Sequence, residues 1–194
     1  MVDVKPIIKQ DTRILRPWEW FVIRDELRVG TQMVCDVSLN TEMRSTEMWS
    51  FLQNEKWFHE PRKAIELPKE AILKKKVTFD ERTILLSDLG TVAVKTVFGW
   101  SHKVREEMDR SNLRKELMQA AIDANLPIDG ICPKMFRKTM ISWLMATIPD
   151  KEPYILMSAG HGKDVQQRHY LAAGFERGDI EEMRKFLKGW GEAQ

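Results

Sequence analysis

Apolar side chains recur at helical spacing over most of the chain, with one interruption over residues 64–86. Leu113, Leu117, Ala120 and Ala121 fall on one face of a segment that Ser111 can cap, which predicts a helix over residues 113–126. Prolines in first turns and similar apolar spacing predict the other helices. They begin at Pro17, at Thr31 and near Arg44, and they cover residues 133–148, 154–159, 165–171 and 179–190.

The interruption has the pattern of a small antiparallel sheet. Residues 64–67, 74–79 and 82–86 are short segments with isoleucine, valine and threonine, separated by Pro68 and by Asp80-Glu81. Residues 1–15 are polar and unpatterned, so we expect a tail or linker there. The sequence therefore predicts a mainly helical domain over residues 16–194 with one small antiparallel sheet, an α+β fold.

Composition indicates one folded domain without a membrane span. The chain has 194 residues, of which 43% are hydrophobic and 31% are charged. No apolar stretch approaches the ~20 residues of a membrane span, and the first fifteen residues are too charged for a signal peptide. Cys35 and Cys132 form no CxxC pair, which argues against a disulfide framework or a structural zinc site. We expect a cytoplasmic protein.

Positive charge is concentrated in two segments, although 31 basic and 29 acidic residues leave a net charge of only +2. Residues 62–82 hold seven basic and four acidic side chains, and residues 131–149 hold three basic side chains without an acidic one. Two such concentrations on one face would suit a phosphate backbone. The alternative is that hairpin lysines form a solvated edge that prevents aggregation.

Several common catalytic templates are missing from the sequence. The run Gly160-His161-Gly162-Lys163 lacks the spacing of a phosphate-binding P-loop and the hydroxyl residue after its lysine. The four histidines are scattered without an HExxH pair, and no GxSxG nucleophile elbow occurs. The sequence therefore points neither to nucleotide hydrolysis nor to a metal-dependent or serine hydrolase.

An ordered set of other residues remains. Arg44 and Glu47 lie three apart at a predicted helix start, Lys76 lies on the predicted hairpin, and Lys134-Met135-Phe136-Arg137 follows Pro133. Gly160-His161 follows an apolar helix, and Tyr170 comes nine residues after His161. This order resembles the tyrosine recombinase (phage integrase) family along most of the chain. The family pattern is a TGxRxxE box, a hairpin lysine, an HxxR box, a GH box and a tyrosine nine residues later.

The resemblance is greatest to integrases of archaeal viruses and plasmids, because Phe136-Arg137-Lys138-Thr139 is followed by Ser142-Trp143. Two positions depart from the family pattern. Lys134 stands where HxxR has histidine, and KxxR is similar to what some archaeal integrases carry. Glu42 stands where the glycine precedes the first arginine, in the turn that aims Arg44. The family's N-terminal core-binding domain has no counterpart here, so we expect a fragment, or a chain that depends on another to clamp DNA.

The resemblance implies a reaction on double-stranded DNA without metal, nucleotide or other cofactor. Tyr170 would attack the phosphorus and form a 3′-phosphotyrosyl link, and Lys76 would protonate the leaving 5′ oxygen. Arg44, Arg137 and His161 would hold the phosphate, with Lys134 assisting and Glu47 supporting. The DNA-binding residues would include Lys74, Lys75, Lys138 and Arg62. The implied assembly is a homotetramer on DNA that is a monomer or weak oligomer in solution, inside the host cell.

Elementary chemistry is compatible with these roles. Charge develops on the non-bridging phosphate oxygens during cleavage, and planar guanidinium groups can each present two donors to it. A phenol is a weak nucleophile at neutral pH and needs cationic neighbours that favour the phenolate. The departing 5′ oxygen is a poor leaving group as an alkoxide and needs a proton, which a hairpin lysine can supply.

Each residue also has an ordinary structural interpretation. Tyr170 alone would be a half-buried aromatic residue, and Arg44 with Glu47 would be a surface helix pair. Strand alternation puts Lys74 on the same face as Lys76, so the identity of the general acid stays open. Two other functions remain as alternatives. One is a non-catalytic DNA-binding module derived from a recombinase, and the other is a nicking and closing enzyme that resembles a type IB topoisomerase.

The last predicted helix, residues 179–190, has a single apolar stripe of Met183, Phe186, Leu187 and Trp190. Such a stripe ordinarily packs on its own domain. In similar recombinases a C-terminal helix is donated to the adjacent protomer. Gly174 and Gly178 flank the start of this segment, so we expect the helix to dock in trans on DNA and in cis without it.

Overall fold

The computed structural model describes residues 5–71, 81–100, 111–160 and 174–192, and helices dominate it. The helices are α1 (Pro17–Asp25), α2 (Val29–Asn40), α3 (Ser45–Leu52), α4 (Asp88–Gly99), α6 (Leu113–Asp123), α7 (Lys134–Thr147), α8 (Glu152–Ala159) and α10 (Arg177–Phe186). The strands are β1 (Ile7–Lys9) and β2 (Thr12–Ile14), which form a hairpin, and β3 (Phe58–His59), β4 (Ala64–Leu67) and β5 (Arg82–Leu85), which form a three-stranded antiparallel sheet. The predicted class, mainly helical with a small antiparallel sheet, is confirmed.

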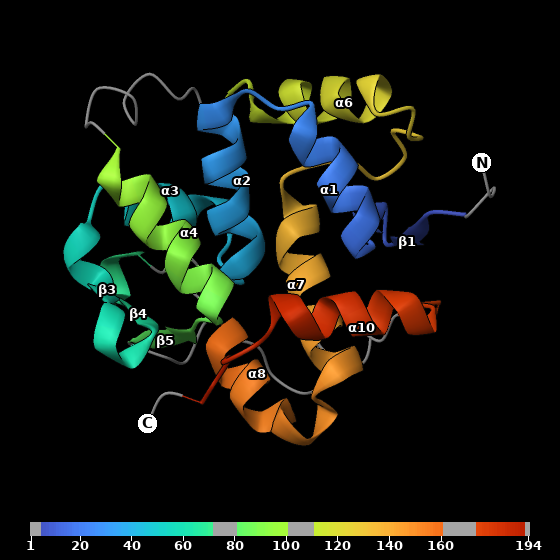
Figure 1. The fold of residues 1–194 in the computed structure, drawn as a ribbon. Helices are drawn as coiled ribbons and strands as arrows, with labels where there is room; N and C mark the ends of the chain where they lie inside the picture. The colour runs from blue at the N-terminus through green and yellow to red at the C-terminus, as the bar shows by residue number, and fades with distance from the viewer. Residues whose placement is uncertain (1–4, 72–80, 101–110, 161–173, 193–194) are drawn as a thin grey trace.

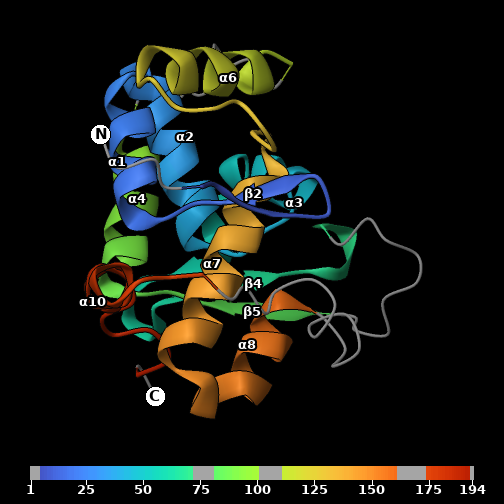
Figure 2. The same cartoon turned by 90° about the vertical axis from the view of Figure 1, so that its right-hand side faces the viewer.

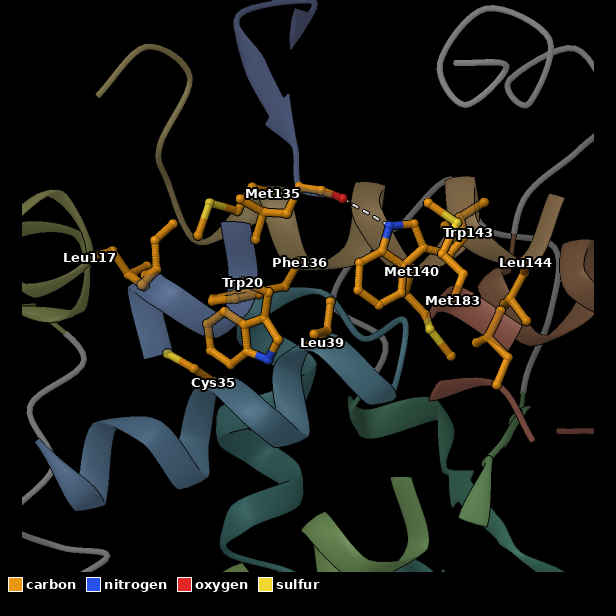
Figure 3. Packing of buried hydrophobic residues seen from close by; sticks show 14 of the residues in the cluster. Trp20, Cys35, Leu39, Leu117, Met135, Phe136, Met140, Trp143, Leu144 and Met183 are labelled. Carbon is orange, nitrogen blue, oxygen red and sulfur yellow. Dashed lines mark hydrogen bonds between the residues drawn. The ribbon is translucent and has the colours of Figure 1, made fainter. Parts of the chain in front are cut away.

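Helix α7 runs through the middle of the larger hydrophobic cluster. Helices α1, α2 and α10 lie around it, and α8 continues from its end (Figures 1 and 2). Met135, Phe136, Trp143 and Leu144 of α7 are buried, and the ring of Trp20 on α1 meets Phe136 edge-on with the ring centroids 5.3 Å apart (Figure 3). Burial of several large side chains, worth ~25 cal/mol per Å² of apolar surface, fixes the orientation of α7.

A second hydrophobic cluster lies between α3, α4 and the sheet β3-β4-β5. Phe51 of α3, Ile65 of β4 and Ile84 of β5 are each fully buried in it. The register of the sheet pairs Leu67 with Arg82. The two clusters meet where α3 and β5 approach the end of α8 and the first half of α7, and the polar cluster described below lies at this junction.

Residues 5–15 are not the expected tail, because residues 7–14 form the β1–β2 hairpin and Ile14 and Leu15 are fully buried. The Trp143 indole donates a 2.8 Å hydrogen bond to the Leu15 carbonyl oxygen, drawn as the dashed line in Figure 3. The hairpin was missed because its two-residue turn, Gln10-Asp11, adopts positive φ at both positions without the Asn-Gly or Asp-Gly signature that predicts such a turn.

The predicted helices agree with the structure except in details of where they begin and end. Helix α2 begins at Val29 rather than at Thr31, whose hydroxyl donates to Glu116 instead of capping the helix. Helix α6 begins after Asn112 rather than after Ser111. The predicted strand over residues 74–79 and the predicted helix over residues 165–171 lie outside the described residues.

The C-terminal helix packs on its own chain. Helix α10 lies across α7 and α1 (Figure 1), and Met183, Leu187 and Trp190 are buried there. The side chains of Arg16 and Asp179 form a buried ion pair at the start of α10. Whether the helix docks in trans when chains assemble on DNA stays a prediction. Among the described helices, none is long and apolar enough to cross a membrane.

Candidate functional site

Arg44 is the N-cap residue of helix α3, and Glu47 in the first turn of the helix contacts it. A carboxylate oxygen of Glu47 accepts a 2.7 Å hydrogen bond from the Arg44 backbone N–H, and the other accepts from the Arg44 guanidinium. This is the carboxylate half of a capping box. The Glu47 side chain is 1% exposed and that of Arg44 is 21% exposed. The pair is therefore not the surface helix pair that the spacing alone allowed.

Arg137 lies in the second turn of α7 and points away from the solvent. Its guanidinium donates one hydrogen bond to the backbone carbonyl oxygen of Glu42 and another to that of Ala159. Glu42 lies in the connection from α2 to α3, and Ala159 is the last residue of α8. Arg137 thus ties together three segments that are distant in sequence, and it is buried rather than part of a solvated surface.

Arg82, the first residue of β5, completes this group. Its guanidinium donates to both Glu47 oxygens, at 2.7 and 3.3 Å, and to the Ala159 carbonyl oxygen at 3.3 Å. Arg82 and Arg137 therefore share one acceptor. We call Arg44, Arg82, Arg137, Glu42 and Glu47 the arginine cluster.

Glu42 differs from the other members of the arginine cluster in its backbone conformation and in its raised pKa. Its φ is 51°, in the left-handed region that residues other than glycine rarely adopt. The side chain is fully buried, and neither carboxylate oxygen makes a hydrogen bond within the described part of the chain. Burial raises the pKa of Glu42 to about 7, against the opposing effects of Arg137 and Arg82 and of the nearby Ser158 and Trp190 side chains.

The two glutamates therefore differ in protonation. Burial would raise the pKa of Glu47, but Arg82, the Arg44 N–H and the charges of Arg44 and Arg137 outweigh it and leave that pKa below its usual value. Glu47 is ionised at neutral pH, whereas Glu42 is close to half-ionised. The three arginines thus carry an excess of one to two positive charges over the two glutamates, and this excess suits an anion such as a phosphodiester.

Three other residues with predicted roles are not among those joined by the hydrogen bonds of the arginine cluster. Lys134 is exposed at the start of α7, one turn before Arg137. Lys138 donates a 2.7 Å hydrogen bond to the Lys9 carbonyl oxygen, which holds the β1–β2 hairpin against α7. Arg62 is exposed and pairs with Glu66 at 2.5 Å, so part of its charge is neutralised locally.

The remaining predicted site residues lie outside the described residues. They are Tyr170, His161, Lys74, Lys75 and Lys76. The structure does, however, describe Gly160, which directly precedes His161. Gly160 has φ 62°, and a Cβ there would lie 2.9 Å from the Arg82 Cδ atom. The glycine of the Gly160-His161 pair is thus needed both for its backbone conformation and for the close approach of Arg82.

Sequence reasoning missed Arg82 and the burial of Glu42. Alternation along the strand gave a usable signal for Arg82, because it places Arg82 on the same face as the apolar Ile84. An arginine that faces a core needs a buried acceptor. No comparable signal existed for Glu42, whose burial depends on two arginines that are distant in sequence. Among the described residues, no group of three His, Cys, Asp or Glu side chains is placed to hold a metal ion.

No family model, no curated protein and no solved structure matches the chain.

Proposed function

We propose that the chain is the catalytic domain of a site-specific DNA recombinase that cleaves and rejoins strands through a 3′-phosphotyrosyl intermediate. One observation carries the proposal. Arg44 and Arg137 lie far apart in sequence, yet Arg82 joins them, because it donates to Glu47, which pairs with Arg44, and shares the Ala159 carbonyl oxygen with Arg137. The cluster also includes the carbonyl oxygen of Ala159, two positions before His161. The residues that resemble the recombinase boxes thus converge where the structure describes them.

In this proposal the cluster holds the scissile phosphate. Arg44 is its most exposed arginine and presents a planar fork to the non-bridging oxygens, where charge develops in the transition state. Arg137 and His161 share that task, and Lys134 assists from the start of α7. The Tyr170 oxygen forms a bond to phosphorus while the bond from phosphorus to the 5′ oxygen breaks, and Lys76 gives that oxygen its proton.

The partner in this proposal is double-stranded DNA, and no cofactor takes part. A homotetramer assembles on the DNA inside the host cell from chains that are monomeric or weakly associated in solution. Lys74, Lys75, Lys138 and Arg62 contribute positive charge along the DNA, and Glu47 keeps Arg44 in place. Affinity for DNA then falls as salt rises, because each phosphate contact releases counterions.

A covalent-adduct experiment tests the proposal. A binding site is first selected from a random duplex library, and a nick is then placed so that cleavage releases a short fragment that cannot be rejoined. We expect a covalent protein–DNA band with the natural chain and none with Tyr170→Phe. Tyr154→Phe is the matched control, because Tyr154 is the only other tyrosine and lies exposed on α8. An adduct of unchanged yield with Tyr170→Phe would show that the nucleophile is a different residue.

The non-catalytic DNA-binding module is the second candidate, and one observation favours it. Arg137 already donates to two backbone carbonyl oxygens, and the carboxyl of Glu42 lies buried beside it. Sequence-specific binding with no adduct on any nicked substrate would favour that module. Adduct formation without exchange between two duplexes would instead indicate the nicking and closing activity.

A further inference from the structure

Two helices of this fold begin with the same construction. At α1, Glu19 accepts a 2.7 Å hydrogen bond from the Arg16 backbone N–H and a 2.5 Å hydrogen bond from Arg13 of strand β2. At α3, Glu47 accepts from the Arg44 backbone N–H and from Arg82 of strand β5. Both constructions combine an arginine before the helix, a glutamate in its first turn and a buried arginine from a strand.

The two constructions differ in what the arginine before the helix does. Arg16 is buried, and its guanidinium donates to Asp179 and to the Gly174 carbonyl oxygen, so its side chain ties α10 to α1. Arg44 keeps 21% of its side chain exposed and donates to Glu47 itself. The first construction therefore joins helices, whereas the second holds a guanidinium at the surface of the arginine cluster.

Arg82, the strand arginine beside α3, also contacts the carbonyl oxygen that holds the guanidinium of Arg137. Arg82 and Arg137 donate to the same carbonyl oxygen, that of Ala159. The Arg82 side chain also fills the space beside Gly160 that a Cβ would occupy. Arg82 thus contacts Glu47, which orients Arg44, and Ala159, which orients Arg137. Its own guanidinium is buried and cannot meet DNA without rearrangement.

We propose that Arg82 is a positioning residue that sets the relative placement of Arg44 and Arg137, which extends the recombinase function proposed above. With Arg82 removed, the hydrogen bonds that Glu47 keeps among the described residues are those from Arg44, and the link from this pair through Arg82 to the end of α8 is lost. The carboxylate and Arg44 can then turn together toward solvent. A displacement of about 1 Å in a reacting group can cost ~10²-fold in rate.

The cleavage test compares Arg82→Met with Arg13→Met. Arg13 is the matched control, because it is equally buried, pairs with the equivalent glutamate and donates to a backbone carbonyl oxygen, that of Pro127. We expect Arg82→Met to bind the selected DNA site as tightly as the natural chain and to lose ~10²-fold in single-turnover cleavage. Arg13→Met should cleave at the natural rate below its unfolding temperature. Arg82→Lys should fall between, because one ammonium cannot contact both Glu47 oxygens and Ala159 at once.

A measurement on the protein alone separates this inference from the proposed function. The Arg44 Nε–Hε signal in a nitrogen–proton NMR spectrum, assigned by its loss in Arg44→Lys, reports whether that guanidinium is held. We expect the signal to shift and broaden in Arg82→Met and to stay unchanged in Arg13→Met. If Arg82→Met does not fold, the Arg44 signal is measured in Arg82→Lys instead, and we expect it to shift and broaden there as well.

The outcomes are distinct. An unchanged Arg44 signal in the Arg82 variants would overturn the positioning role, and so would an equal loss of cleavage in Arg13→Met. A natural chain that forms no adduct would overturn the proposed function alone. In that event the NMR comparison still decides whether Arg82 positions Arg44.

Discussion

The guanidinium of Arg137 donates a hydrogen bond to the backbone carbonyl oxygen of Glu42, which joins α7 to the connection between α2 and α3. Glu42 holds a left-handed backbone there, the conformation for which glycine is the usual residue. The recombinase pattern that the sequence resembles has glycine at this position. Glu42 therefore adopts a backbone conformation that favours glycine and places a buried carboxyl near Arg82 and Arg137.

Arg44→Ala and Arg137→Ala should both lower cleavage, but they should differ in stability. Loss of one donor to a developing oxyanion costs ~10²–10³ in rate. Arg137→Ala also removes the donor to the Glu42 carbonyl oxygen, at ~1–3 kcal/mol for an acceptor left unsatisfied, whereas the Ala159 carbonyl oxygen keeps Arg82 as a donor. Arg44→Ala leaves Glu47 its pairing with Arg82, so chemical denaturation should show a much smaller loss.

Lysine variants are the control for charge at these two positions. Arg44→Lys should not restore the cleavage rate, because an ammonium group cannot reproduce the bidentate fork. Natural rates of cleavage in either alanine variant would contradict a role in holding the phosphate.

Glu42 should make stability fall as pH rises through the weakly acidic range. Its pKa is raised from 4.5 to about 7 in the fold, so between these values the folded chain binds more protons than the unfolded chain. The free energy of unfolding is therefore highest below pH 4.5, where Glu42 is neutral in both states. It declines as pH rises and has lost this contribution above about pH 7, where Glu42 is ionised in the fold as well. A rise in pKa of this size corresponds to ~3 kcal/mol between the two protonation states.

Glu42→Gln should remove this pH dependence, because the amide resembles the neutral carboxyl at every pH. Urea denaturation from pH 4.5 to 8.5 would show the variant gaining stability relative to the natural chain as pH rises. Parallel stability curves for the natural chain and Glu42→Gln would show that Glu42 titrates normally.

Lys76 should act on the leaving group, in the recombinase mechanism proposed here. A DNA substrate with sulfur in place of the 5′-bridging oxygen has a leaving group that needs no proton. Lys76→Ala should then cleave this substrate at nearly the natural rate, while it cleaves ordinary DNA slowly. Lys74→Ala and Lys75→Ala are the controls, and rescue in one of them but not in Lys76→Ala would move the general acid to that lysine.

Sequence patterns predicted the helices well because the apolar faces of α6, α7 and α10 repeat over three turns or more. They failed for the β1–β2 hairpin, whose strands are three residues each and whose turn lacks glycine and asparagine. Short strands gain their stability from contacts distant in sequence, such as that of Leu15 with Trp143. The pattern of residues within such a short strand therefore says little about whether the strand forms.

In the candidate site, too, the local contact could be predicted from the sequence and the contact between distant segments could not. Arg44 and Glu47 could be predicted as a pair because the capping interaction at a helix start is local and fixes their spacing. The contact of Arg82 with Ala159 joins a strand to the end of a helix and depends on how the two hydrophobic clusters meet. Only the folded chain specifies that junction.

Helix α10 should contribute to the stability of the single chain. Met183 is fully buried against the large cluster, whereas Arg184 beside it is exposed. Met183→Ala should therefore cost ~2–5 kcal/mol in unfolding free energy, and Arg184→Ala should lie within ±0.5 kcal/mol of the natural chain. Thermal and denaturant unfolding of the two variants measure the difference, and equal stabilities would mean that the helix is not docked in solution.

Exchange of α10 between protomers requires the helix to leave this cis position when chains assemble on DNA. The rings of Phe21 on α1 and Phe186 on α10 lie 5.4 Å apart, so cysteines at these positions can be joined by a short bis-maleimide. In a chain that also carries Cys132→Ser, the cross-link fastens α10 to its own domain, while Cys35 is buried and protected. We expect the cross-linked chain to bind a single DNA site normally and to form little of the two-duplex complex. The same chain without the reagent should assemble fully. Full assembly after cross-linking would mean that α10 stays in cis on DNA, and exchange of this helix would then play no part in the reaction.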